Sequence, residues 1–405
     1  MLSAHIWIKR TSSLSHLRRV GWQFLPWRND AQSQWAAFGR GDCHMRILYV
    51  DFLGVRGGMG HYNEALVAAY EQAGASVEVV TSSHDASYDL RANVHVSRLF
   101  RLAVDRSKPR VLRAIGYSVG YLGCLRLAPQ ADVVVMHFLH RPVADRWAIK
   151  AFRRLGCRLV LVAHDPHPVV PGQRDVAYQR CLGLFDLIVV HGPKARADIV
   201  AQGAPAEKVI VTPHGDSRPK PPPDPAAARS ALGLPDMARP TAAIIGNLRL
   251  DKGILRARQA LEAGPSPVRT LLVAGSKQGD WDLEEALRTS DHSQLEVVRV
   301  IRRMSDFEER GAYSLADVVL VLHQSGYSSG VIARAHSMGK PVVFTDVGDL
   351  AMQARPGDVV LTVDYSADQL RKAIERCLRA GVEAPTEWES GPWLFQARSV
   401  LAFLG

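Results

Sequence analysis

Five prolines within a run of seven residues, 219–225, divide the sequence into two parts. Proline fixes its own φ angle and has no backbone N–H, so such a run neither continues a helix nor lies inside a sheet. It is typical of a semi-rigid connector between two domains. At 405 residues the chain is also longer than one average hydrophobic core requires, so two domains are expected.

The part before the prolines shows the alternation of a parallel α/β sheet. Residues 47–50 read as an apolar strand, a glycine-rich loop follows, residues 61–73 have helical spacing, and residues 77–81 read as the next strand. Two strands joined by such a helix pair in parallel. Further apolar strands are expected at residues 132–136, 158–162, 187–190 and 209–212.

The part after the prolines repeats this alternation, with strands expected at residues 241–245, 270–274, 294–300, 318–322 and 341–344. The sequence therefore predicts an α/β protein with two parallel sheets. We expect a first domain at residues 45–217, a proline-rich linker at 218–239 and a second domain at 240–380. A basic extension at residues 1–44 precedes them, and a helical tail at 381–405 follows.

Composition narrows the classes of protein that the chain can represent. Its 47% apolar and 22% charged residues are ordinary for a globular protein, and no window has the roughly 18 uninterrupted apolar residues of a spanning helix. Five scattered cysteines form no CxxC pair, which favours a reducing cytoplasm. The net charge of +10 indicates a polyanionic partner, such as nucleotide phosphates, nucleic acid or an anionic membrane surface.

The basic extension, residues 1–44, has two interpretations. Its basic residues are interleaved with Trp7, Trp22, Trp27 and Trp35, which is typical of a segment that lies on an anionic membrane. Alternatively it is an upstream extension, and the working domain begins at Met45, directly before the first strand.

Two further basic stretches, residues 98–113 and 141–158, fall between the strands of the first part. The second has the spacing of an amphipathic helix, with Arg146 and Lys150 around Trp147. It is either a solvated helix face or a contact with a membrane surface or lipid phosphate.

Two loops have the small residues of ligand-binding loops. Small residues lead from the strand at 318–322 into a helix, and unpaired backbone N–H groups of Ser328, Ser329 and Gly330 at its N-terminus would favour a phosphate. An ordinary turn with a serine N-cap is the alternative.

The second loop follows the first strand and contains Gly57, Gly58 and Gly60, which would let a ligand approach the backbone at the carboxyl edge of the sheet. Its spacing is not GxGxxG, and no acidic residue ends the next strand, so a dinucleotide site is not indicated.

Histidines follow several strands of the first part: His137, His164, His191 and His214. Parallel strands bring their carboxyl ends to one edge, so these side chains are expected to lie together. No metal site is predicted, because His164 and His167 lie on a proline-containing loop without a third ligand. Asp280 and Asp282 resemble a metal signature, but they precede a helix and are better explained as capping residues.

These motifs together resemble the GT-B glycosyltransferases, in particular the glycogen-synthase-like (family 4-like) group, over about residues 45–380. The resemblance rests on Val-Thr-Pro-His-Gly at 211–215, on the segment from Gly246 to Lys252-Gly253, and on their order along the chain. It implies two Rossmann-like domains that face each other across a cleft.

The resemblance also implies a donor site. In that family a basic pair holds the donor diphosphate; Lys252, followed by Gly253, matches its lysine. Arg249 takes the position of the arginine in a subset of members, whereas Asn247 stands where many members have arginine. Ser328, Ser329 and Gly330 fall in the donor-binding segment, and the family's first glycine loop, here Gly57, Gly58 and Gly60, lies beneath donor and acceptor.

One departure is large. The family commonly has two glutamates eight positions apart, and Gly326 and Arg334 occupy the matching positions here. The chain is similar to a subset that lacks this pair, so retaining stereochemistry is not implied. His164 resembles the histidine that contacts the reacting sugar, and Asp165 is the candidate general base if the reaction inverts.

We therefore expect a glycosyltransferase that uses a nucleoside-diphosphate sugar as co-substrate. Its expected location is the cytoplasm, either free or peripheral on the inner face of the cell membrane. Neither a cofactor nor a metal is expected, because Arg249, Lys252 and a helix N-terminus would neutralise the leaving diphosphate. The expected acceptor is lipid-linked or a glycan. A nucleotide-sugar epimerase of the same fold and a catalytically silent nucleotide-sugar-binding protein are the alternatives. No nucleic-acid-binding motif organises the basic residues.

Overall fold

The computed structural model describes residues 45–54, 59–82, 93–105, 107–167, 174–290, 293–381 and 390–405. All of them lie in the larger of the two compact units into which the chain divides, Cys43–Gly405. The basic extension at residues 1–44 and the glycines Gly57 and Gly58 lie outside the described residues.

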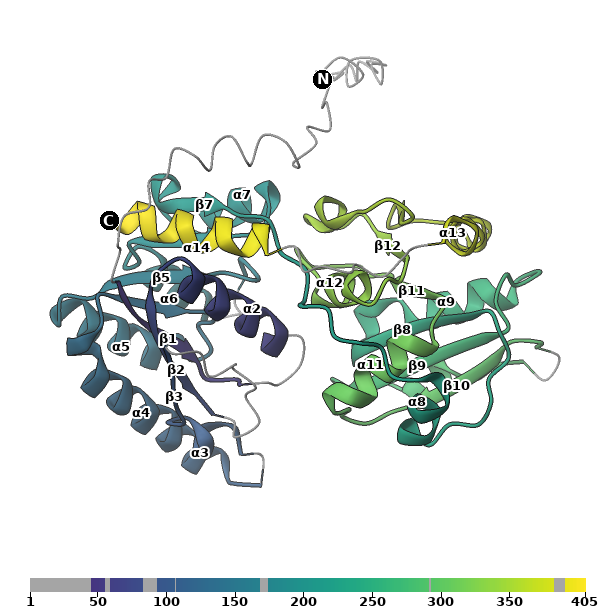
Figure 1. The fold of residues 1–405 in the computed structure, drawn as a ribbon, viewed down its shortest axis with the longest axis horizontal. Helices are drawn as coiled ribbons and strands as arrows, with labels where there is room; N and C mark the ends of the chain where they lie inside the picture. Colours follow the sequence, from purple (N-terminus) through teal and green to yellow (C-terminus); the bar gives the residue numbers. More distant parts are fainter. Residues whose placement is uncertain are drawn as a thin grey trace, which may run out of the picture. The chain divides into compact units, whose positions relative to one another are not determined.

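The first lobe is built on a seven-stranded parallel sheet with the strand order β3-β2-β1-β4-β5-β6-β7 (Figure 1). Its strands are β1 (Arg46–Asp51), β2 (Ser76–Thr81), β3 (Val94–Ser97), β4 (Val133–Met136), β5 (Arg158–Val162), β6 (Leu187–Val190) and β7 (Val209–Val211). Its helices are α2 (Met59–Gln72), α3 (Arg101–Val104), α4 (Arg110–Leu127), α5 (Pro142–Arg154), α6 (Arg174–Leu182), α7 (Pro193–Ala201) and α14 (Gly391–Leu404), with the short turns η1 (Ala128–Gln130) and η2 (Ala206–Lys208). The order reverses between β1 and β4, which is where open α/β sheets bind ligands.

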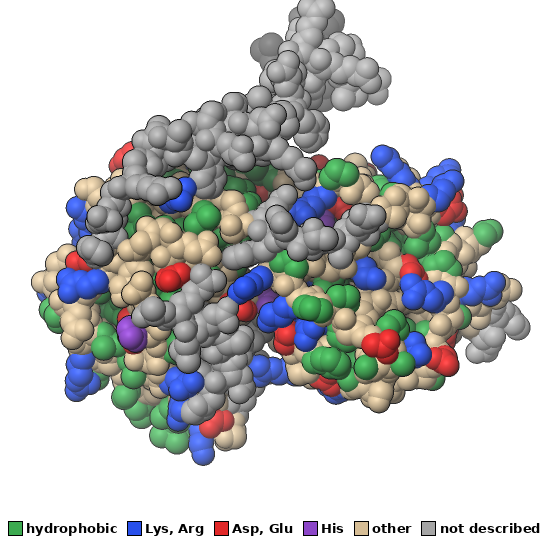
Figure 2. All heavy atoms as spheres, viewed as in Figure 1, with side chains coloured by type: hydrophobic (Ala, Val, Ile, Leu, Met, Phe, Trp, Pro, Cys, Tyr) green, Lys and Arg blue, Asp and Glu red, His purple; other side chains and the backbone are tan. Residues whose placement is uncertain are grey.

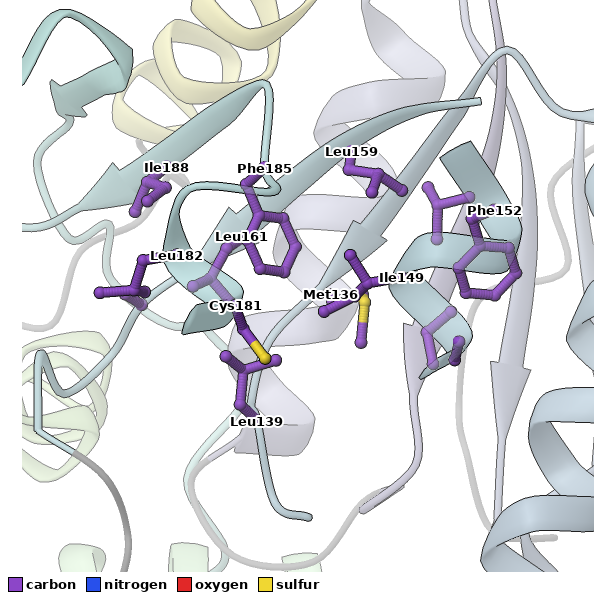
Figure 3. Close-up of a cluster of buried hydrophobic side chains, with 14 of the residues drawn as sticks. Met136, Leu139, Ile149, Phe152, Leu159, Leu161, Cys181, Leu182, Phe185 and Ile188 are labelled. Atoms are coloured by element: carbon purple, nitrogen blue, oxygen red, sulfur yellow. The ribbon is translucent and has the colours of Figure 1, made fainter. Parts of the chain in front are cut away.

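Helices cover both faces of this sheet, which explains why β4 and β6 are apolar along their whole length. The buried side chains of α4, α5 and α6 pack on one face, and those of α2 and α14 pack on the other. Figure 3 shows part of the first core, where Ile149 and Phe152 of α5 meet Met136 and Leu161 of the strands. Four buried free cysteines, Cys124, Cys157, Cys181 and Cys377, lie in the cores of the described chain and pack there as small apolar side chains.

The second lobe has a six-stranded parallel sheet with the order β10-β9-β8-β11-β12-β13. Its strands are β8 (Thr241–Leu248), β9 (Thr270–Lys277), β10 (Glu296–Val300), β11 (Val318–Val321), β12 (Val342–Thr345) and β13 (Val359–Leu361). Its helices are α8 (Pro225–Leu232), α9 (Ile254–Glu262), α10 (Leu283–Ala286), α11 (Asp306–Leu315), α12 (Gly330–Ser337) and α13 (Ala367–Ala380), with turns η3 (Leu250–Lys252) and η4 (Leu350–Gln353). The predicted fold class, α/β with two parallel sheets, is confirmed.

The range expected to be a linker, residues 218–239, contains helix α8. The Asp224 carboxylate accepts hydrogen bonds from the amides of Ala226 and Ala227 at 2.9 and 3.1 Å, and Pro225 occupies the first helical position. Helix α8 packs against α11 of the second lobe. The connection between the lobes is therefore shorter than the expected range.

The C-terminal helix α14 returns to the first lobe and packs beside α2 (Figure 1). Its Trp393 is 1% exposed, lies with its ring 4.7 Å from that of Tyr62, and donates a hydrogen bond from Nε1 to the carbonyl oxygen of Asp216 at 2.8 Å. The last residues of the chain thus complete the core that the first strands begin.

Candidate functional site

A cavity of about 1430 Å³ is lined by residues of both lobes. The first lobe contributes residues of α2, α3 and α4, and the second contributes the segment after β8, the start of α11 and the start of α12. The cavity contacts seven of the predicted site residues: Gly60, Asn247, Arg249, Lys252, Ser328, Ser329 and Gly330. The predicted residues His164, Asp165 and Gly253 do not line it.

Lys252 is a partly buried lysine that borders this cavity. Its Nζ lies 2.7 Å from Nε2 and 3.2 Å from Nδ1 of His323. Burial, with the Lys252 ammonium as the second cause, lowers the pKa of His323 to about 3, so the neutral ring accepts a hydrogen bond from the ammonium. Burial, followed by repulsion from Arg249, also lowers the pKa of Lys252 to about 8. In the described part of the chain no carboxylate forms an ion pair with Lys252, so its charge is available to an anion.

Arg249 is held in place by its neighbour Asp251. Its Nε and Nη2 donate to the two Asp251 oxygens at 2.8 and 2.7 Å, and this pairing raises the pKa of the guanidinium. A bidentate pair fixes the plane of the guanidinium, which leaves its remaining N–H groups oriented for a ligand. Asn247, at the end of β8, is exposed at the same edge.

Gly253 acts through its backbone. It has φ +68° between η3 and α9, and a Cβ added there would lie 2.5 Å from the carbonyl oxygen of Leu322. Only glycine combines this left-handed conformation with so close an approach. Gly253 therefore lets Lys252 lie against the end of β11, directly beside His323.

The start of α12 differs from the expected phosphate loop in one respect. The Ser329 amide is not free, because it donates to Oε1 of Gln353 at 2.7 Å, while Nε2 of Gln353 donates to the Ser329 carbonyl at 3.1 Å. Gln353 lies 24 residues further along the chain, in η4, so no local pattern reveals this contact. The Ser328 and Gly330 amides have no hydrogen bond among the described residues and border the cavity.

Arg334, at a position where the resembling family commonly has glutamate, is a buried cation. It is 1% exposed, and its Nη2 donates to Oδ1 of Asp306 at 2.7 Å. Its Nε and Nη1 are buried without a partner among the described residues, although Arg334 borders the cavity. Unpaired buried donors of this kind cost stability. They mark a position where an oxygen atom of a ligand would accept a hydrogen bond.

Carboxylates reach the cavity from another helix. Asp306 and Glu309 lie in the first turn of α11. Oδ2 of Asp306 is 3.7 Å from Nζ of Lys220, and its Oδ1 is 3.5 Å from Nε2 of His61. Burial raises the pKa of Glu309. Sequence reasoning missed these residues, although a Ser305/Glu308 capping box marks the helix start that presents them.

His164 and Asp165 lie beside the cavity rather than in its wall. Nε2 of His164 is 3.1 Å from Nδ1 of His137, and burial holds the pKa of His164 well below its usual range, so the ring is neutral. Asp165 is exposed, and its Oδ1 accepts a hydrogen bond from the amide of His167 at 2.9 Å. Its charge contributes to the raised pKa of Arg249, which places it within electrostatic range of the cationic edge.

The four histidines expected at one edge do lie together. Ring centroids are 5.4 Å apart for His137 and His164, 5.6 Å for His164 and His191, and 5.2 Å for His191 and His214. Among the residues that the structure describes, no group of His, Cys, Asp and Glu side chains has the arrangement of a metal site. Asp282 caps α10 by accepting from the Glu285 amide at 2.9 Å, as predicted.

Both lobes match known protein families. Residues 57–215 match the family described as "Glycosyl transferase 4-like domain", and residues 239–380 match "Glycosyl transferases group 1". The chain belongs to the GT-B glycosyltransferases. The resemblance seen in the sequence is thus confirmed for both halves of the chain.

Related sequences and structures agree with that assignment. The chain is 27% identical over 277 residues to the D-inositol 3-phosphate glycosyltransferase of Rhodococcus jostii, and 29% identical over 248 residues to that of Mycobacterium bovis. These matches cover 64% and 58% of this chain, and 61% and 50% of the relatives, so the chain spans less than two thirds of their length.

Two solved structures share the fold. HepE from Anabaena, in complex with UDP-glucose, is 18% identical with a TM-score of 0.63, covering 89% of this chain and 100% of that one. Sucrose-phosphate synthase from Thermosynechococcus elongatus, also 18% identical, has a TM-score of 0.60 and covers 89% of this chain and 96% of that one.

Proposed function

We propose that this protein transfers a sugar from a nucleoside-diphosphate sugar to an acceptor, with the donor diphosphate held at Lys252. The observation that carries the proposal is the partly buried Lys252 ammonium, which borders a large cavity and has no carboxylate partner in the described chain. A cation in such surroundings attracts a diphosphate strongly, because little water screens it. HepE, which shares the fold, binds UDP-glucose, and this supports a nucleotide sugar as the donor.

Charge moves toward the diphosphate during the proposed reaction. The bond between the anomeric carbon and the diphosphate oxygen breaks, an acceptor oxygen bonds to that carbon, and its proton passes to a base. Lys252, Arg249 and the free amides of Ser328 and Gly330 would stabilise the leaving diphosphate, as fixed donors do where charge develops. These groups support transfer without a metal or other cofactor.

Two residues are candidates for the base that takes the proton of the acceptor. Asp165 remains our candidate for an inverting reaction, with the neutral His164 positioning the sugar; the proximity of Asp165 to the Arg249 charge supports this role. Glu309 is a second candidate, because it borders the cavity and burial raises its pKa, the direction that makes a carboxylate a better general base. Ribose recognition is proposed for Arg334 and Asp306, in place of the family's glutamate.

We propose a lipid-linked or glycan acceptor, approached from the first lobe at the inner face of the cell membrane. The cavity wall formed by α2, α3 and α4 is the place for it, because the donor groups all lie on the second lobe.

The first test is a thermal-shift screen against UDP, GDP, ADP and their sugars, in which a ligand of the native state raises the unfolding midpoint. Lys252→Ala is then expected to lower turnover about 100- to 1000-fold, as the loss of one group that stabilises a transition-state charge does. Lys372→Ala is the matched control, because Lys372 is an exposed lysine of the same lobe, paired with Asp368. Near-wild-type activity of the Lys252 variant would contradict the proposed function.

The alternatives predict different results. An epimerase would convert the sugar nucleotide without any acceptor, which NMR of the donor alone detects. A silent binding protein, suggested by Gly326 and Arg334 in place of the glutamate pair, would bind a diphosphate in calorimetry without turnover with any acceptor.

A further inference from the structure

Helix α4 exposes a row of large apolar side chains. The buried side of the helix carries Tyr117, Tyr121 and Cys124, so α4 is apolar on both sides. A helix at the surface of a globular protein normally has a polar outer face. The outer face of α4 instead carries Val111 (70% exposed), Leu112 (43%), Ile115 (50%), Val119 (55%) and Leu122 (45%).

Neighbouring helices extend this row into a surface. Both α3 and α5 contact α4. Leu102 of α3 is 37% exposed, and Val143 and Trp147 of α5 are 80% and 51% exposed. We call these eight side chains of α3, α4 and α5 the α4 surface. In Figure 2 hydrophobic atoms gather over α4, at the lower edge of the first lobe, with Lys and Arg atoms around them.

The surroundings of the α4 surface are cationic. Arg110 of α4 and Lys150 and Arg154 of α5 are exposed, and none of the three has an ion pair among the described residues. Helix α4 contains no Asp or Glu. The one carboxylate of α5, Asp145, is buried and accepts hydrogen bonds from the hydroxyls of Tyr117 and Tyr121 at 2.7 and 3.0 Å. An apolar surface with basic flanks and no exposed acid on α4 or α5 complements an anionic lipid surface.

The same helices also form part of the cavity. Arg113 and Tyr117 of α4, and Ala103 and Val104 of α3, line it. One side of α4 therefore faces the cavity region that we propose for the acceptor, while its other side carries the α4 surface. A molecule anchored in a layer beneath the α4 surface would have its polar part next to the cavity.

We propose that the α4 surface docks on an anionic lipid bilayer, with α4 lying along the interface and its outer side chains in the boundary of the acyl chains. At 18 residues α4 is about 27 Å long, at 1.5 Å per residue. No helix in the described ranges is long and apolar enough to cross a membrane, so this contact is peripheral. The proposal deepens the proposed function, since it explains how a lipid-linked acceptor would reach the cavity, and rests on that function for its purpose.

The test is flotation of the full-length protein with vesicles of phosphatidylcholine alone or with about one third phosphatidylglycerol. We expect binding to the anionic vesicles that weakens with salt. The double variant Ile115→Ser/Val119→Ser is expected to lower the partition coefficient at least about tenfold, because it removes apolar area that would enter the interface. Lys150→Glu/Arg154→Glu should lower it about as much.

The matched control is Met352→Ser/Phe403→Ser, which changes two apolar residues of similar exposure (51% and 46%) outside the α4 surface and should bind like the wild type. The basic extension is present in the wild type and in every variant. Any lipid affinity that it has therefore contributes equally and does not affect the comparison between them. Equal binding by the α4 variants and the wild type would overturn the proposal. Wild-type self-association in light scattering that the α4 variants abolish, without lipid binding, would assign the surface to a second copy and likewise overturn it.

The two proposals fail separately. The midpoint shift caused by UDP, GDP or ADP reports the donor site and is expected in the α4 variants as in the wild type. If the wild type does not bind vesicles but a nucleotide still raises its unfolding midpoint, the proposal for the α4 surface is overturned and the proposed function stands. Vesicle binding by a protein that no nucleotide shifts would leave the α4 surface in place and remove the proposed function.

Discussion

The pKa of Lys252, lowered to about 8, predicts that the proposed binding of a donor diphosphate depends on pH. Below pH 8 the side chain is charged and attracts a diphosphate; above pH 8 it loses its proton, and the affinity should fall. We expect the dissociation constant of the diphosphate that binds best in the screen to rise about tenfold or more between pH 7 and 9.5, measured by calorimetry. Lys252→Arg keeps its charge throughout and should show a flat profile. A flat wild-type profile would contradict the role of Lys252.

Gly253 and Gly233 form a matched pair for a test of backbone strain. Both are left-handed, with φ +68° and +69°, but a Cβ at Gly233 would meet nothing within 4 Å, whereas one at Gly253 would meet the Leu322 carbonyl at 2.5 Å. Gly233→Ala should cost about 1–2 kcal/mol of unfolding free energy, from the left-handed conformation alone. Gly253→Ala should cost about 1–3 kcal/mol more, because the backbone must move.

Urea unfolding measures the two costs, and nucleotide affinity gives an independent reading. Gly253→Ala is expected to weaken diphosphate binding, because Lys252 would shift with the backbone, and Gly233→Ala is not. Equal costs for the two variants would show that the close approach at Leu322 is unimportant.

Among single residues, the sequence identified those whose contacts are made within a short stretch of the chain. Lys252 and Gly253 belong to one short motif, so their neighbourhood is visible in the sequence. Gln353 takes the Ser329 amide from 24 positions away, and Arg334 is paired with Asp306 from the preceding helix. Contacts of that kind depend on tertiary packing, which no local pattern encodes.

The strands that end in histidine make the first lobe sensitive to acid. Burial lowers the pKa of His137 and His191 to about 3 and that of His164 well below its usual value. In the unfolded chain a histidine takes up a proton near pH 6.5. The stability is therefore fully present above pH 6.5 and is lost progressively as the pH falls from 6.5 toward 3, by about 1.4 kcal/mol per pH unit for each histidine.

His137→Phe isolates one of these contributions. Its ring lies among aromatic rings and its Nε2 has no partner in the described chain, so phenylalanine suits the site. Relative to pH 7.5, the wild type should lose about 2 kcal/mol more at pH 5 than the variant does, measured by urea unfolding at both values. His95→Phe, on an exposed histidine of β3, is the control and should keep the wild-type pH dependence. Identical pH dependence in all three proteins would contradict the argument.

Element by element, the buried strands were the most predictable part of the fold. Strands β4, β6 and β11 are apolar throughout, and β5 is apolar after Arg158, because helices cover both sheet faces; a continuous apolar run is a strong signal. The short edge strands β3 and β13 escaped prediction, since each is partly exposed and depends on one neighbour for pairing.

For the whole molecule, Trp393 tests how the C-terminal helix supports the first lobe. Trp393→Ala should cost about 3–5 kcal/mol of unfolding free energy, as truncation of a buried tryptophan does. Hydrogen exchange should show the loss in α2 and β1, because α14 packs on that face. The control is Trp281→Ala in the second lobe, a partly exposed tryptophan bonded to the Gln278 carbonyl at 2.9 Å. Exchange that rises only in the second lobe of the Trp393 variant would refute this.

The position of α14 also sets an order in time for a chain on the ribosome. Residues 45–211, which hold the described strands of the first sheet, are synthesised before α14, whose Trp393, Ala397 and Val400 cover part of one face of that sheet. The described strands and helices of the second lobe end by residue 380. The second lobe therefore emerges before the first lobe receives α14, and until then part of one apolar face of the first sheet stays uncovered.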